Sequence, residues 1–156
     1  MAEQNREVAE LMKLLPGFVE EQIPFNKVLG LPVESLDMES VSLKIDMKEE
    51  LTGNPVKGIL HGGVISAVHD VTGGITAAMG VLEKVADRPL EEMGKRLLNV
   101  GSIDLRIHFL RPGLGTYFLA TGSLMRTGQK VAVIRMQLHN DQDRLIAVGT
   151  GTYTVG

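Results

Sequence analysis

The stretch GILHGGVISAVHDVTGG, residues 58–74, combines features that are seldom found together in one helix. An apolar run follows two adjacent glycines, Gly62 and Gly63, and contains a single carboxylate, Asp70. Its apolar residues recur at helical spacing, which predicts a helix over about residues 62–79. Glycine weakens a helix by ~1 kcal/mol relative to alanine, and a carboxylate on a covered helix is costly unless paired. Both residue types therefore need an explanation.

The helical wheel divides this stretch into two different sides. One is a narrow apolar stripe, which we expect to face a sheet: Val64, Val68, Val71, Ile75 and Ala78. Asp70 lies on another side, together with small residues: Gly63, Gly74 and Ala77. Small residues allow a second backbone or a thin ligand to approach closely. This side therefore predicts either tight packing between subunits or a substrate beside Asp70, and the two are compatible.

The predicted start of the helix is a second candidate feature. The first turn of a helix carries amide N–H groups without internal partners, at the positive end of its dipole. Gly62 and Gly63 leave these amides free of side-chain cover, so a carbonyl oxygen that gains negative charge could bind there. His61, at the helix start, is predicted either to cap the helix or to take part directly in the chemistry.

The rest of the chain predicts an α+β fold in one domain. A short amphipathic helix over residues 3–15, limited by Pro16, is followed by strand-like alternation over residues 28–47. A polar excursion over residues 82–99 separates the long helix from a strand at residues 102–112. Three more strands follow, with turns at residues 126–130 and 140–144. This order predicts an antiparallel sheet with the long helix lying along one face.

Composition excludes several classes of function. The 156 residues carry a net charge of −3, no long basic run and only 4% aromatic residues, which argues against a nucleic-acid partner. Without cysteine the chain has no disulfide and no thiolate nucleophile. The histidines lack a recognisable zinc spacing, and no glycine loop of dinucleotide type occurs, so we expect no metal and no cofactor. No signal-type leader or spanning run is recognised, so we expect a cytoplasmic protein without a membrane partner.

The motif HGGVISAVHD, residues 61–70, resembles the His-Gly-Gly motif of the hotdog-fold thioesterases. The similarity is to the branch that includes the phenylacetate-pathway thioesterases and human acyl-CoA thioesterase 13. SIDLRIHFLRPGLG, residues 102–115, resembles the third strand of this family, and residues 124–153 resemble its last strands. The resemblance covers roughly residues 32–154.

This resemblance implies a hotdog fold, in which an antiparallel sheet wraps around a long central helix. We expect an N-terminal helical segment over residues 1–24 and a single hotdog thioesterase domain over residues 25–156. The family also implies a homodimer with shared active sites, assembled further as a dimer of dimers. The implied reaction is hydrolysis of an acyl-CoA thioester.

The resemblance further assigns catalytic roles to individual residues. Asp70 of one subunit would face the Gly62 amide of the other and act as general base or nucleophile, while that amide polarises the thioester carbonyl. Asn54 resembles the family asparagine that contacts the thioester or orients water. Ser102 resembles the strand hydroxyl beside the aspartate, and His61 belongs to the motif itself.

Substrate contacts are expected at two further sets of residues. Gly63 and three basic side chains, Arg111, Arg126 and Lys130, are expected at the substrate and at the phosphates of CoA. The acyl pocket is expected to be formed or covered by the excursion at residues 82–99 together with four apolar residues: Ile65, Val68, Met79 and Leu82. The few aromatic residues favour an aliphatic or broad range of acyl groups.

Two other functions remain open at this point. A hydratase or dehydratase of the same fold would act on acyl-CoA, but its histidine–carboxylate motif is not found. A non-catalytic acyl-CoA-binding module would keep the pocket without hydrolysis. A serine hydrolase is disfavoured because no Gly-x-Ser-x-Gly motif is present.

Overall fold

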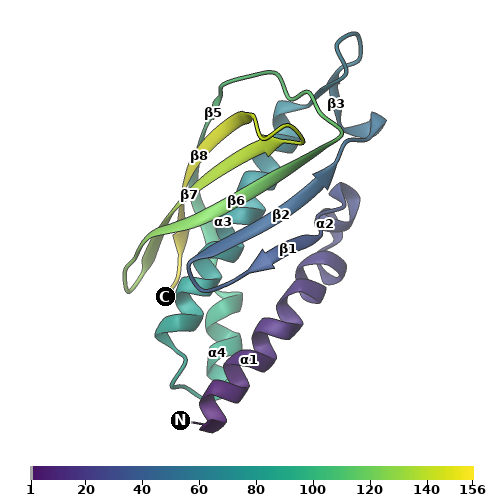
Figure 1. Ribbon diagram of the computed structural model, residues 1–156. Helices are drawn as coiled ribbons and strands as arrows, with labels where there is room; N and C mark the ends of the chain where they lie inside the picture. The colour runs from purple at the N-terminus through teal and green to yellow at the C-terminus, as the bar shows by residue number, and fades with distance from the viewer. Residues whose placement is uncertain (1) are drawn as a thin grey trace.

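A six-stranded antiparallel sheet curves around one long helix, α3, in the computed structural model of the chain (Figure 1). The structure describes residues 2–156, with side chains from Arg6 onward. In chain order the elements are α1 (Ala2–Gly17), η1 (Phe18–Gln22), α2 (Pro24–Leu29), β1 (Val33–Leu36), β2 (Ser40–Asp46), η2 (Glu49–Leu51), β3 (Thr52–Asn54), β4 (Ile59–Leu60), α3 (Gly62–Lys84), α4 (Leu90–Leu98), β5 (Gly101–Phe109), β6 (Tyr117–Thr127), β7 (Val131–Asn140) and β8 (Leu145–Thr154).

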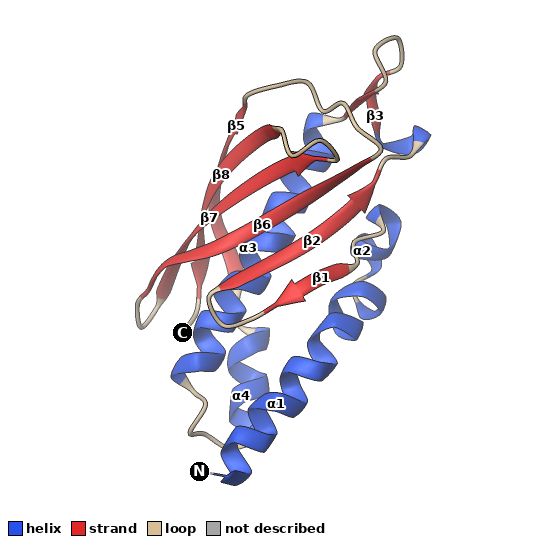
Figure 2. Ribbon diagram, viewed as in Figure 1, coloured by secondary structure: helices blue, strands red, loops and turns tan. Residues whose placement is uncertain are grey.

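The order of strands in the sheet is β1-β2-β6-β7-β8-β5, and every neighbouring pair is antiparallel. The predicted turns lie where expected, between β6 and β7 and between β7 and β8. Strand β5 pairs with β8 alone, so one of its edges is free within the chain. The helices lie together on one side of the sheet (Figure 2), which confirms the α+β prediction.

The face of α3 that contacts the sheet differs in part from the predicted apolar stripe. This face includes buried polar side chains among its apolar ones, and a Cβ added to Gly122 of β6 would overlap the Thr76 hydroxyl. Thr72 and Thr76 can be buried there because their hydroxyls donate to main-chain carbonyls of the preceding turn, at 2.7 Å each. His69 lies in the same way against Gly149 of β8. Small residues of the strands thus lie opposite polar side chains that bond within their own helix. These contacts lie beside the apolar contacts expected from periodicity.

The predicted stripe packs against the sheet at Val64, Val68 and Val71 and against the N-terminal helices further along. Ile75 and Ala78 of α3 share a cluster with Val19 of η1 and Met93 of α4. The apolar face predicted for the first helix lies against the same cluster: Val8, Leu11, Met12 and Leu15. The stripe is buried as predicted and its first part contacts the sheet, but its second part is also covered by the N-terminal segment, which is itself part of the core.

The ends of two helices differ from the predicted ones. Pro16 lies inside α1, which continues to Gly17 and then into the π-helical turn η1. A proline removes a hydrogen bond and crowds the preceding turn, and a π turn directly after it accommodates this irregularity. Helix α3 continues to Lys84 rather than ending near Met79, and residues 90–98 form a true helix, α4, within the predicted excursion.

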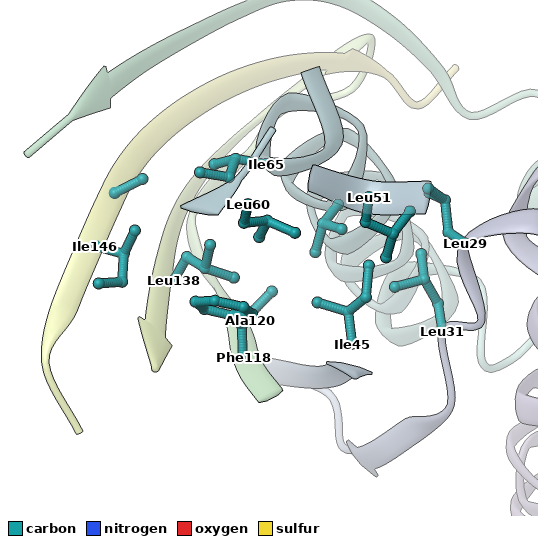
Figure 3. Close-up of a cluster of buried hydrophobic side chains, with 12 residues drawn as sticks. Leu29, Leu31, Ile45, Leu51, Leu60, Ile65, Phe118, Ala120, Leu138 and Ile146 are labelled. Atoms are coloured by element: carbon teal, nitrogen blue, oxygen red, sulfur yellow. The ribbon is translucent and has the colours of Figure 1, made fainter. Parts of the chain in front are cut away.

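A second cluster of buried side chains fills the upper end of the fold between α3 and the sheet (Figure 3). Ile65 and Val68 belong to this cluster, and Met79 and Leu82 are also fully enclosed, at 0% exposure each. These four side chains therefore form the core rather than the predicted acyl pocket.

Helix α3 is long and apolar enough to cross a bilayer by length and composition, contrary to the sequence expectation. However, 61% of its most hydrophobic window is buried inside the fold, as in the core helix of a water-soluble domain.

The contact at Gly122 gives a test of the helix–sheet packing. We expect Gly122→Ala to lower the free energy of unfolding by about 1–3 kcal/mol, because the added methyl group meets Thr76 and the Thr72 carbonyl. The matched control is Gly94→Ala in α4, where an added Cβ meets no atom within 4 Å. It should stabilise the protein by about 0.5–1 kcal/mol through helix propensity. Urea unfolding at one protein concentration measures both, and equal effects would contradict the packing described.

Candidate active site

Asp70 projects from the flank of α3 and is held by the start of β5. The Ser102 hydroxyl donates to Asp70 Oδ1 at 2.6 Å, a short hydrogen bond of the charge-assisted kind. No other carboxylate lies between His61 and Gly80. The structure thus brings together two of the predicted site residues from segments 32 positions apart.

Tyr153 of β8 lies behind Asp70 and was not identified from the sequence. Its hydroxyl donates to the Asp70 main-chain carbonyl at 3.2 Å. Its ring occupies the space left by Gly73 and Gly151, where a Cβ would lie within 3 Å of it. Burial, and then the negative charge of Asp70, raise the pKa of Tyr153, so it remains a neutral donor. The sequence signal for Tyr153 is the pair of glycines that lie against its ring. These glycines can be matched to Tyr153 only when the position of β8 relative to α3 is known.

Two hollows of different character meet at Asp70 and Ser102. One is a mainly apolar cavity of about 350 Å³ between α3, η1 and the end of α4. The other is an open hollow beside the free edge of β5, lined also by Ser66, Ile103 and Asp104. A group bound at Asp70 can therefore have an apolar part inside the fold and a polar part outside it.

At the start of α3, His61 caps the helix, which is one of the two roles predicted for it. The Gly63 N–H donates to His61 Nδ1 at 2.8 Å, so this amide is not available to a ligand. For the Gly62 N–H, no acceptor is found among the described residues. Gly62 lies against Phe109 of β5, whose Cε1 atom would be 3.3 Å from a Cβ at this position. Of the two predicted amides, Gly62 alone keeps a free donor.

Gly62 and Asp70 do not share a site within one chain. They are eight residues apart on α3, about 12 Å along the helix axis. Gly62 lines a different hollow of about 350 Å³, together with Phe109 and Arg111. Arg111 donates from its guanidinium to the Leu145 carbonyl at 2.9 Å, which fixes the side chain beside this hollow.

The remaining predicted residues lie elsewhere. Asn54, at the end of β3, accepts from the Val56 and Lys57 amides at 3.1 Å each, so its oxygen closes a turn. Arg126 and Lys130 lie at the β6–β7 turn, near the end of the sheet where β5 begins, whereas Arg111 follows the other end of β5. The three basic residues therefore form no single cluster within one chain.

His69, which precedes Asp70, faces the core and is 0% exposed. Its Nδ1 lies 2.9 Å from the Ile65 carbonyl and so carries the proton, while Nε2 has no partner in the described chain. Burial lowers the pKa of His69 below its usual 6.5, although the Ile65 hydrogen bond partly opposes this. The prediction that His69 and Asp70 form no dyad agrees with this geometry, because neither ring nitrogen of His69 bonds to Asp70.

A family model described as the thioesterase superfamily matches residues 57–147, which include α3 and most of the sheet. The chain belongs to the thioesterase superfamily and has its hotdog fold. The fold and family predicted from the motif at residues 61–70 are thereby confirmed. The narrower branch, with the phenylacetate-pathway enzymes, stays a prediction.

Among curated relatives, the medium/long-chain acyl-CoA thioesterase YigI of Escherichia coli is 40% identical over 94% of this chain and 95% of its own. A crystal structure from Shewanella oneidensis, related to the thioesterase superfamily, is 46% identical with a TM-score of 0.92. It covers 96% of this chain and 97% of its own. A structure from Syntrophus aciditrophicus is 45% identical, has a TM-score of 0.85 and covers 98% and 99%. These relatives match the N-terminal helices as well as the hotdog core.

The buried imidazole predicts a pH dependence of stability. The unfolded chain protonates His69 near pH 6.5, whereas the folded chain resists this protonation, so stability is full above that pH and falls as pH decreases. We expect His69→Leu to reduce the loss of stability between about pH 7 and about pH 5.5, because leucine takes up no proton in the unfolded chain. Urea midpoints of both proteins at the two pH values measure this. An unchanged pH dependence in the variant would contradict it.

Proposed function

We propose that the protein hydrolyses acyl-CoA thioesters to the free acid and CoA, with medium or long aliphatic acyl groups as substrates. The observation that carries this proposal is the Asp70 carboxylate, held by Ser102 at the mouth of an apolar cavity. The name of the 40% identical relative, a medium/long-chain acyl-CoA thioesterase, supports the same reaction and acyl range. Location in the cytoplasm is part of this proposal.

In this reaction the oxygen of water adds to the thioester carbonyl carbon, the carbon–sulfur bond breaks and a proton reaches the departing thiolate. Asp70 either takes a proton from the attacking water or attacks as the nucleophile, in which case water cleaves the resulting anhydride. Ser102 orients the carboxylate in both routes. The free Gly62 N–H, at the positive end of the helix dipole, binds the carbonyl oxygen as it gains negative charge.

Because Gly62 and Asp70 are apart within one chain, the complete site needs two copies of the protein. The free edge of β5 is the surface for this contact. Its nine residues are long for an unprotected edge, and they expose two large apolar side chains, Ile103 at 52% and Phe109 at 56%. Antiparallel pairing of β5 with its copy about a two-fold axis would join both sheets into one.

The register of this pairing follows from the positions of the two half-sites. Asp70 lies beside Ser102 near the start of β5, and Gly62 lies beside Phe109 at its end. A two-fold axis between Leu105 and Arg106 sets Ser102 of each copy opposite Phe109 of the other. This register brings the Asp70 side of each copy to the Gly62 side of the other, which gives two equivalent sites per dimer. Association of two dimers into a tetramer remains part of the proposal.

Arg111 is the basic residue best placed to bind a CoA phosphate. It lies beside the Gly62 hollow and is held there by the Leu145 carbonyl. Arg126 and Lys130 could reach the same CoA molecule only from another copy. Asn54 keeps its amide N–H₂ free to donate, since its oxygen is bound within the turn.

Replacement of the carboxylate tests the reaction. We expect Asp70→Asn to lower kcat on octanoyl-CoA by about 100-fold or more, because the amide can neither accept a proton from water nor attack. Release of thiol, followed with a colour reagent, measures this; circular dichroism and size-exclusion chromatography check that the fold and assembly are unchanged. Equal rates would remove Asp70 from the reaction. Binding of acyl-CoA without any hydrolysis by the wild type would instead support the non-catalytic module.

Mixing of two inactive variants tests the shared site. Gly62→Pro removes the N–H and adds a ring, at a helix position where proline is tolerated and after a residue, His61, with the extended ψ of 134° that a following proline requires. We expect kcat to fall by about 10²–10³, whereas Gly62→Ala, which keeps the N–H, serves as the control for the added Cβ.

Co-expression of Gly62→Pro with Asp70→Asn, each with a different tag, gives mixed dimers with one intact site. We expect these dimers to recover about half of the wild-type activity, since one of their two sites has both groups. Activity no higher than that of the separate variants would contradict a site shared between copies.

A further inference from the structure

The apolar cavity that begins at Asp70 is enclosed by the N-terminal helices as well as by α3. Its walls combine one side of α3, from Asp70 through Gly74 to Ala78, with Phe18 and Val19 of η1. The buried Asn26 also lines it, and its amide nitrogen donates to the Val19 carbonyl at 2.9 Å. Away from Asp70, Ser102 and Asn26, every described residue that lines the cavity is apolar or a glycine.

A second hollow continues this cavity away from Asp70. It has a volume of about 210 Å³ and lies between α1, η1 and α4, of which α1 and α4 lie beside each other at the lower end of the fold (Figure 1). Four residues line both hollows: Leu15, Phe18, Leu97 and Leu98. Leu11, Leu14 and Gly94 complete the second one, and no charged side chain lines it among the described residues. The two hollows thus share walls, and Asp70 carries the one charged side chain among their described lining residues; the pair is called the channel.

Three large apolar side chains remain exposed at the far end of this channel. Leu14 is 68%, Phe18 45% and Leu98 75% exposed. Large apolar side chains gathered at one place favour an apolar ligand, because covering them is favourable by about 25 cal/mol per Å².

We propose that the acyl chain of the substrate extends from Asp70 through the cavity into the groove between α1 and α4, and that these two helices set the longest chain accepted. This inference rests on the proposed function, and it names where the aliphatic chain binds and which residues limit it. An unbranched chain fits because the two hollows share walls, lack charge beyond Asp70 and begin at the candidate active site. The thioester then lies at Asp70 and Ser102, with the CoA moiety in the open hollow beside β5.

Gly94 allows the far part of this channel to be filled without disturbing the fold. A Cβ at this position meets no atom within 4 Å, so the ring of Gly94→Phe can occupy the hollow. The matched control is Lys95→Phe, which adds the same ring to the next position of α4, where the lysine side chain is 71% exposed. A second variant, Gly74→Leu, fills the near part, and its Cβ meets only Tyr153, at 3.8 Å.

The measurement is the ratio of kcat/KM for palmitoyl-CoA to that for octanoyl-CoA. Each buried methylene is worth about fourfold, so loss of the far hollow should lower this ratio about tenfold or more in Gly94→Phe. Lys95→Phe should keep the wild-type ratio. Gly74→Leu should also lower activity on octanoyl-CoA relative to butanoyl-CoA, because it closes the channel nearer to Asp70.

An unchanged ratio in Gly94→Phe would overturn the proposal, and so would a change of oligomeric state in this variant, which would identify the groove as a contact between copies. Each variant is also made in the Asp70→Asn background, and calorimetry measures its affinity for palmitoyl-CoA, octanoyl-CoA and butanoyl-CoA. The ratio of these affinities reports the preference for chain length without turnover. A wild type that releases no thiol from any of these thioesters would therefore contradict the proposed function, while the binding ratio still decides where the acyl chain lies.

Discussion

The close contact between α3 and the inner face of the sheet is the constraint on which the rest of the structure depends. Gly122 and Gly149 have no side chains, so the helix approaches the strands until Thr76 and His69 fill the space. This contact fixes the rotation of α3 about its axis. One flank then faces the N-terminal helices, and the other, which carries Asp70, faces the start of β5.

This rotation explains which parts of the site could be predicted from the sequence. Asp70 and Ser102 were identified because a lone carboxylate among small residues, and a hydroxyl at the start of a strand, match a known motif. Tyr153 could not be identified, because its role depends on the register that sets β8 behind α3. Arg111 and Lys130 do not lie together within one chain, because the strands place them at opposite ends of the sheet, and their role at CoA stays a prediction.

Periodicity predicted the elements well but only some of their partners. The alternation in β2 and β5–β8 and the long apolar helix gave the α+β class. The apolar stripe of α3 is predicted to face the sheet and does so in part, yet hydroxyls that bond their own helix share that face. Periodicity alone does not show that α1 and α4 cover the rest of the stripe, because that contact depends on the tertiary fold.

The pairing of β5 with β8 has a consequence for biosynthesis. Strand β8 begins 35 residues after β5 has been synthesised, and β5 pairs with no other strand in the chain. Until β8 emerges from the ribosome, β5 has no neighbouring strand in the sheet, so Ser102 is not yet held in place. The exposed apolar edge of β5 is therefore formed only when the sheet is complete, which shortens the time in which this edge can pair unspecifically during synthesis.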